Sequence, residues 1–184
     1  MRELALHLMD IAENSVAAQA KTIHLEVEEE TAADRLWICV RDDGRGMDAE
    51  MVQRVVDPFV TSRTTRKVGL GIPLLKAAAE ACNGFLEIQS QPGVGTELQV
   101  QFQRSHIDRM PLGDIAATMI SLLVAHPEIH WIFRYKVDGA EFLFDDAPVK
   151  EVLGDIPLTE PDILAYLRET IESGVREVHT MELI

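Results

Sequence analysis

Hydrophobic and polar positions recur along the chain with two periods, and each change of period marks a new element. Leu4, Leu8 and Ile11 recur at helical spacing, so a helix is expected over residues 2–19. The next two apolar runs instead alternate with a period of two, which is typical of strands with one solvated face. The same criteria predict the following series: strands over 21–30 and 35–42, helices over 48–56 and 72–84, and a hairpin over 85–102.

A second series of elements begins after residue 103. It comprises a helix over 111–126 begun by Pro111, two strands around Asp138-Gly139, and a helix that starts near Thr159. Helices and antiparallel strands in this order indicate the α+β class. We expect a two-layer α/β sandwich over residues 1–103, followed by a smaller α+β domain over 104–184, with Trp131 in its core.

Composition narrows the classes of partner. The 184 residues are 47% hydrophobic and carry a net charge of −14, which opposes binding to nucleic acid and to anionic lipid. No apolar run approaches the roughly 20 residues of a membrane span, and the acidic start does not suit a signal peptide, so a cytoplasmic protein is expected. The spacing of Cys39 and Cys82 suggests core thiols, with neither a disulfide nor a metal site.

The first helix carries an unusual polar pair. Asn14 is a poor residue for a helix interior, and Asp10, four positions earlier, shares its face. A solvated helix face is one explanation. A carboxylate beside a carboxamide is also a pair of hard oxygen ligands, suited to Mg²⁺ and to orienting a water molecule.

The chain has two glycine motifs, of which the first follows a predicted strand and the second precedes a predicted helix. In "DDGRGM" the residues Asp42, Gly44 and Gly46 are spaced two apart, which allows close backbone approach to a flat ligand, although a tight turn is an equally good explanation. The "GLG" of residues 69–71 opens a helix, where free N–H groups can bind phosphate. It fits neither a Walker loop nor a dinucleotide fingerprint.

Together these pieces resemble the GHKL superfamily of ATPases, which includes DNA gyrase, MutL and the sensor histidine kinases. "DIAENSVAAQAKTIHLEV" is similar to its N box, "VRDDGRGM" to its first glycine box, "DPFVTSRTTRKVGLGI" to the F box, lid and second glycine box, and "PGVGTELQVQF" to its closing strand. The resemblance covers residues 1 to about 103 and implies the Bergerat ATP-binding fold.

The resemblance also implies roles for individual residues. Asn14 would coordinate the Mg²⁺ on ATP, Asp42 would accept a hydrogen bond from the adenine amino group with support from Thr96, and Gly44 and Gly46 would make room for the base. The phosphate-binding group would comprise the backbone N–H of Gly69, Leu70 and Gly71, with Lys67, Arg63 and Arg66 as lid cations.

Two departures concern catalysis. Gyrase-like and MutL-like members place a water-activating Glu four positions before the Mg²⁺ ligand, whereas this chain has Asp10, with Glu13 as a weaker candidate, and histidine kinases have an amide there. "SHIDRMPL", residues 105–112, is similar to the histidine-kinase H box, which would make His106 a phospho-acceptor. Its order is inverted and Ile107 replaces an acidic neighbour, so a linker is the favoured interpretation.

Three functions remain open from the sequence. The preferred one is a histidine-kinase-like enzyme that uses ATP and Mg²⁺ to phosphorylate or regulate a separate protein partner, in two-component or anti-sigma fashion. The second is an ATPase switch of the MutL or gyrase kind, and the third is a nucleotide-binding regulator without turnover. A homodimer is compatible with each of them.

Overall fold

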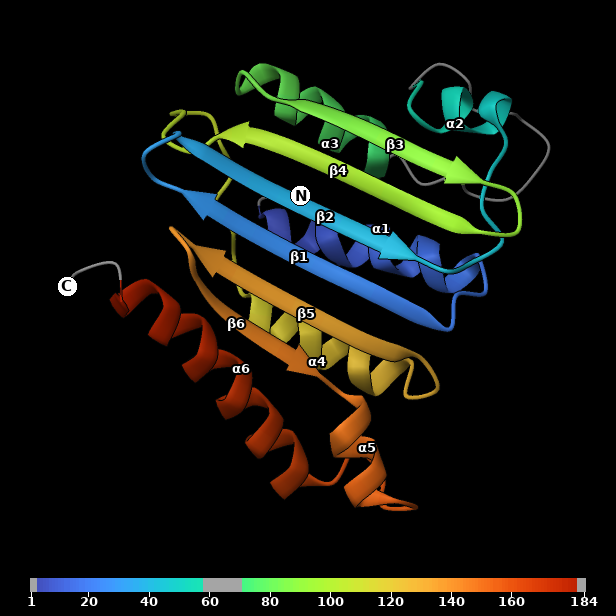
Figure 1. The fold of residues 1–184 in the computed structure, drawn as a ribbon, viewed down its shortest axis with the longest axis vertical. Coiled ribbons are helices and arrows are strands. Elements are labelled where there is room, and N and C mark those ends of the chain that lie inside the picture. Colours follow the sequence, from blue (N-terminus) through green and yellow to red (C-terminus); the bar gives the residue numbers. More distant parts are fainter. Residues whose placement is uncertain (1–2, 58–70, 182–184) are drawn as a thin grey trace.

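Strands from both halves of the sequence form one six-stranded sheet, and the helices pack on one of its faces (Figure 1). The computed structural model describes residues 3–57 and 71–181. The strand order is β3-β4-β2-β1-β5-β6, with all neighbours antiparallel except β1 and β5. The protein is therefore a two-layer α/β sandwich, in agreement with the α+β class expected from the sequence.

The elements lie close to their expected positions. The strands are β1 (Thr22–Glu30), β2 (Arg35–Asp42), β3 (Phe85–Gln91), β4 (Gly95–Gln103), β5 (His130–Val137) and β6 (Ala140–Asp145). The helices are α1 (Leu4–Ala17), α2 (Ala49–Val55), α3 (Gly71–Ala81), α4 (Ile115–Ala125), α5 (Ala147–Leu153) and α6 (Pro161–Met181). No helix within the described ranges 3–57 and 71–181 combines the length and apolarity needed to cross a membrane.

The core lies between the helices and the sheet face that they cover. Alternate residues of each central strand point into it, as Ile23, Leu25 and Val27 of β1 show with exposures of 0–1%. The aromatic side chain of Trp131, on β5, is also fully buried, as expected. The opposite sheet face carries the polar residues of the same strands, which is why the alternation is so regular in the sequence.

The C-terminal part continues the same sheet. β5 pairs in parallel with β1, from Thr22 opposite His130 onward, so the strands on both sides of the predicted boundary at 103/104 belong to one sheet. The backbone N–H groups of Leu4 and Ala5 donate to the carbonyl oxygens of Pro111 and Leu112, at 3.0 and 2.8 Å. The segment that connects the two parts thus accepts hydrogen bonds from backbone N–H groups in the first turn of α1, which have no partner within the helix.

Some details of the C-terminal part differ from expectation. The prediction that Pro111 begins a helix is wrong: α4 begins at Ile115, because Gly113 has φ +83° and the side chain of Asp114 caps the helix by accepting from the N–H of Ala117 at 2.8 Å. The short helix α5 was not predicted, and α6 continues to Met181.

A partly buried polar cluster fixes the end of α6 to the sheet. The hydroxyl of Tyr135 donates to Glu29 at 2.6 Å and lies 3.0 Å from Nε2 of His179, while Arg104 forms an ion pair with Glu29 at 2.8 Å. Burial raises the pKa of Glu29, but the hydrogen bonds from Tyr135 and Arg104 outweigh it, and the pKa lies below its usual value.

Candidate functional site

The side chain of Asp42 lies at the end of β2, on the face of the sheet that the helices cover. Asp42 as a whole is only 9% exposed. The hydroxyl of Ser15 donates to Oδ2 at 2.6 Å and the N–H of Gly44 donates to Oδ1 at 2.9 Å. A carboxylate has about four acceptor positions, so Asp42 is fixed in orientation and keeps capacity to accept from a ligand.

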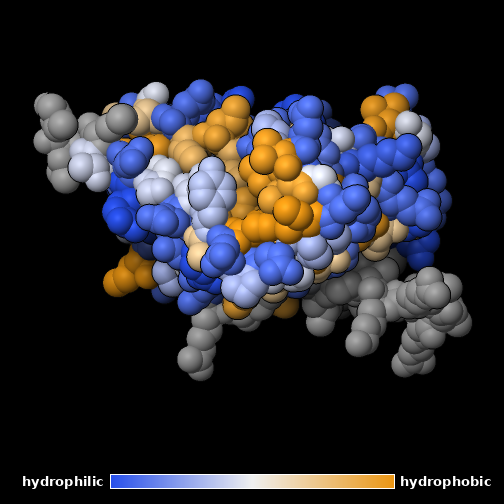
Figure 2. All heavy atoms as spheres, turned by 90° about the horizontal axis from the view of Figure 1, so that it is seen from below, coloured by the Kyte–Doolittle hydropathy of each residue, from blue (hydrophilic) through white to orange (hydrophobic). Residues whose placement is uncertain are grey.

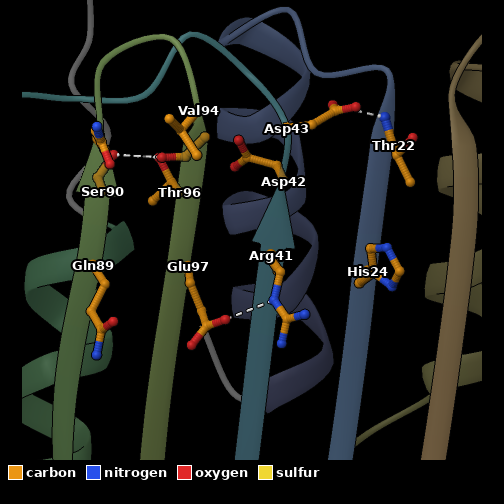
Figure 3. A pocket seen from close by; sticks show the side chains of 12 residues that line it. Thr22, His24, Arg41, Asp42, Asp43, Gln89, Ser90, Val94, Thr96 and Glu97 are labelled. Carbon is orange, nitrogen blue, oxygen red and sulfur yellow. Dashed lines mark hydrogen bonds and ion pairs between the residues drawn. The ribbon is translucent and has the colours of Figure 1, made fainter.

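The neighbouring strand ends supply a second hydrogen-bonded pair (Figure 3). Thr96 of β4 lies directly opposite Asp42 in the sheet. Its hydroxyl is 2.9 Å from that of Ser90, which also accepts from the N–H of Met47 at 2.8 Å. Thr96 is thus placed beside Asp42, and Ser90 joins it to the turn after β2. The support of adenine binding by Thr96 stays a prediction.

Asp43 has a different role from its neighbour. Its carboxylate accepts from the backbone N–H groups of Lys21 and Thr22, at 2.7 and 2.9 Å. Burial raises the pKa of Asp43, but these backbone hydrogen bonds more than offset it and leave the pKa below its usual value. Asp43 is therefore engaged in joining β1 to the turn, and Asp42 is the carboxylate directed at the cavity.

A cavity of about 670 Å³ lies between α1, α2 and the sheet. Its polar lining comprises Asn14, Ser15, Asp42, Arg45, Asp48 and Thr96. Its apolar lining comprises Ile11, Ala17, Ala18, Val40, Met47, Met51, Val55, Ile72, Ile88, Pro92 and Leu98. A shallower groove of about 540 Å³ on the open face of the sheet shares Asp42 and Thr96 with it. Apolar walls around one buried carboxylate, Asp42, suit a flat base that presents a donor.

The two polar residues of α1 point to different places. Asn14 is exposed and lines the cavity. A Cβ atom added to Gly71 would lie 3.2 Å from Oδ2 of Asp10, so the Asp10 carboxylate is packed against the first residue of α3. Glu13 is engaged elsewhere, since Nε2 of His126 lies 3.0 and 3.2 Å from its two carboxylate oxygens.

The glycines of the first motif fit closely against the protein's own backbone. A Cβ atom at Gly46, which has φ +66° and lines the cavity, would lie 1.9 Å from the carbonyl oxygen of Gln91. At Gly44 it would lie 2.9 Å from the carbonyl oxygen of Ala18. Both positions therefore require glycine for chain packing, in addition to the role expected next to a base.

Part of the predicted site falls outside the described residues. This set comprises Arg63, Arg66, Lys67, Gly69 and Leu70. His106, the histidine of the segment similar to an H box, lies in the turn after Gln103, which pairs with Arg35 at the far end of β2 from Asp42. Seven residue steps along a strand correspond to roughly 24 Å, so His106 is remote from the cavity.

Sequence reasoning missed Ser15 and Ser90 as parts of the site. Ser15 had a detectable signal: it is a polar residue on the apolar stripe of α1, four positions after Ile11, and it is 4% exposed. A buried hydroxyl needs a partner, which indicates a polar group across the core. Ser90 gave no comparable signal, because alternating polar residues are ordinary on strands.

Comparison with known proteins gives the family of the first 106 residues. Residues 1–106 match the family described as histidine kinase-, DNA gyrase B-, and HSP90-like ATPase. Among curated proteins, the chain is 31% identical over 97 residues to sensor histidine kinase YxdK of Bacillus subtilis, and 38% identical over 89 residues to sensor protein kinase FleS of Pseudomonas aeruginosa. These segments cover 50% and 48% of this chain, but only 30% and 22% of the two kinases, which extend well beyond the match.

A solved structure shows the same fold over more of the chain. The N-terminal domain of a DNA repair protein aligns with a TM-score of 0.56 at 13% identity and covers 95% of this chain and 57% of that one. The similarity therefore includes the C-terminal strands. At this identity it shows the fold and nothing further.

Proposed function

The chain belongs to the family of histidine kinase-, DNA gyrase B- and HSP90-like ATPases. We propose that it binds ATP with Mg²⁺ at the Asp42 cavity and uses the nucleotide to phosphorylate or regulate a separate protein. The observation that carries the proposal is the buried Asp42 carboxylate, held by Ser15 and Gly44 at the end of an apolar cavity. Its remaining acceptor positions suit the amino group of adenine.

The residues present fit a magnesium nucleotide. Asn14 offers a side-chain oxygen at the exposed part of the cavity, where Mg²⁺ would be held, and the first turn of α3 begins beside Asp10 at Gly71. Bound Mg²⁺ would neutralise charge on the phosphate oxygens. The chain's own contribution is to orient the base through Asp42 and to present backbone N–H groups at a helix N-terminus.

In the kinase form of the proposal, the acceptor belongs to another protein. A nucleophilic atom of that protein attacks the γ-phosphorus, the bond from phosphorus to the bridging oxygen breaks, and its electron pair remains on ADP while the acceptor loses a proton to base or solvent. The remote position of His106, roughly 24 Å from Asp42 along β2 and β4, supports an acceptor outside this molecule.

A second candidate is an ATPase switch. It is supported by the contact of Asp10 with Gly71, which puts a carboxylate at the end of α3 where the phosphates would lie. In this function Asp10 takes a proton from water, which then attacks the γ-phosphorus and releases phosphate.

Calorimetry with ATP and Mg²⁺ tests the site. Asp42→Asn is expected to abolish measurable binding, because it can present a donor to the adenine amino group, a buried mismatch of about 1–3 kcal/mol in addition to the lost acceptor. Asp43→Asn is the matched control, since that carboxylate bonds the backbone of β1. Equal affinity in the wild type and Asp42→Asn would refute the assignment.

γ-labelled ATP separates the two functions. If Asp10 activates water, Asp10→Asn lowers the rate of free phosphate release by about 10²–10⁴-fold and leaves ATP binding nearly unchanged. If the protein is a kinase, basal hydrolysis is slow in the wild type and label appears on protein. His106→Ala is expected to behave like the wild type, and acid-labile label lost in that variant would instead identify His106 as an acceptor.

A further inference from the structure

Three exposed side chains with large apolar parts lie on α5, on α6 and in the turn that joins the two helices. Val152 is 87% exposed, Ile156 is 53% exposed and Tyr166 is 60% exposed, although all three are large side chains. Figure 2 views the molecule from this side and shows apolar residues gathered in the middle of the face, surrounded by hydrophilic ones. Clusters of this kind commonly mark interaction sites. We call these three residues the α5–α6 patch.

The patch has an acidic border. Four exposed carboxylates lie in the same stretch of chain: Glu151, Asp155, Glu160 and Asp162. Within the described ranges 3–57 and 71–181, none of the four takes part in an ion pair. The one cation between residues 147 and 166, Lys150, has its Nζ atom 2.6 Å from the buried carboxylate of Asp146. The border therefore has a strong net negative charge.

The patch lies at the same end of the sheet as the candidate nucleotide site. Asp43 bonds the N–H of Thr22, Thr22 pairs with His130, and Nε2 of His130 lies 2.8 Å from Asp145, two residues before α5. The strands β2 and β6 are three strand spacings apart, or about 14 Å. A protein bound at the patch would lie at the same end of the sheet as Asp42.

We propose that the α5–α6 patch is a docking surface for a protein partner that presents an apolar, helical or extended segment bordered by Lys and Arg. Apolar contact with Val152, Ile156 and Tyr166 supplies affinity, and the four carboxylates select a basic border and increase the association rate. This inference deepens the proposed function and rests on it, because it names the class of protein that the ATP-bound chain would phosphorylate or regulate.

Charge distinguishes this occupant from a second copy of the chain. Two copies joined patch to patch would bring their acidic borders together, within the Debye length of about 8 Å at physiological salt. Like charges at that distance oppose association. A basic segment has the opposite effect on the same carboxylates, so charge complementarity favours it.

Designed peptides provide a direct probe. We use an 18-residue amphipathic peptide of Leu and Lys, a version with Ser in place of Leu, and a version with Glu in place of Lys, each measured by fluorescence anisotropy. The Leu/Lys peptide is expected to bind with amide chemical-shift changes confined to residues 147–169. The Val152→Asp/Ile156→Asp double variant should weaken it by about tenfold or more, as for an anchor residue. The matched control is Ile107→Asp, since Ile107 is 93% exposed near the other end of the sheet.

Three outcomes would overturn the docking proposal. The first is equal binding of the Ser/Lys and Leu/Lys peptides, and the second is an equal loss of peptide affinity in the Ile107→Asp control. The third is self-association of the wild type in sedimentation that Val152→Asp abolishes, because this would identify a second copy of the chain as the occupant of the patch. ATP affinity is measured in the same variants and should stay unchanged. Failure of the wild type to bind ATP would overturn the proposed function, whereas loss of docking with ATP binding intact concerns the patch alone.

Discussion

Ser15→Ala tests whether the contact between α1 and Asp42 holds the candidate site together. The hydroxyl of Ser15 donates to Oδ2 of Asp42 at 2.6 Å, and both residues are buried. A hydrogen bond to a charged group contributes about 1.5–3 kcal/mol to stability. The variant should therefore lower the free energy of unfolding by about 2 kcal/mol, or roughly 4–8 °C in Tm for a chain of this size.

The size of the effect should depend on the charge of Asp42. In an Asp42→Asn background the hydroxyl faces a neutral amide, where a hydrogen bond contributes about 0.5–1.5 kcal/mol. A double-mutant cycle should therefore give a coupling energy of about 1 kcal/mol between Ser15 and Asp42. The same variant should weaken ATP binding, because the carboxylate that receives the base loses one of its two fixed donors.

Urea unfolding at neutral pH measures the cycle, and calorimetry measures the affinity. Ser121→Ala is the matched control: its hydroxyl also lies on a helix, but it is exposed and bonds the carbonyl oxygen of Ala117 at 2.8 Å. A loss in Ser15→Ala no larger than in Ser121→Ala would contradict the proposed contact. So would a penalty of equal size in the wild-type and Asp42→Asn backgrounds.

Three other predictions concern the fold around the site. Gly46→Ala should cost about 1–3 kcal/mol more in urea unfolding than Gly93→Ala: both glycines have positive φ, but only the first would place its Cβ atom 1.9 Å from a backbone oxygen, and equal losses would contradict this. The pKa of Glu29 is lowered in the folded protein, so the ionised Glu29 stabilises the fold above its ordinary pKa of 4.5, and this stabilisation is lost as the pH falls further. The difference in unfolding free energy between the wild type and Glu29→Gln should therefore shrink as the pH falls from 4.5. A constant difference would count against this role of Glu29. Burial raises the pKa of Cys39 to about 12, so iodoacetamide at pH 8 should modify this thiol only in urea, and rapid native labelling would be inconsistent with the structure.

Local patterns predict most of the first 103 residues because local physics determines them. The alternation in β1 marks one buried face, Asp48 accepts from the N–H of Met51 at 2.8 Å as a predicted N-cap should, and Asn83 ends α3 with φ +55°. The polar candidates Asp42 and Asn14 also line one cavity in the structure. Their roles in binding stay predictions until nucleotide affinity is measured.

Long-range relations were beyond the sequence patterns. The hydroxyl of Ser15 meets Asp42 across 27 residues of chain, and nothing in the spacing of either residue names the other. The parallel pairing of β5 with β1 joins residues more than one hundred positions apart. An alternating pattern identifies a strand and its buried face, but carries no information on which neighbour it pairs with.

The helix α1 is where these long-range relations meet, and it connects the candidate nucleotide site to the C-terminal part of the chain. Its first turn is bonded by the connection at Pro111, its Glu13 carboxylate is held by His126 after α4, and the next residue, Asn14, faces the cavity. The C-terminal part therefore contacts the same helix that supplies Asn14 and Ser15. We expect a displacement of α4 to reach the candidate nucleotide site through α1, because packed helices move as units and not residue by residue.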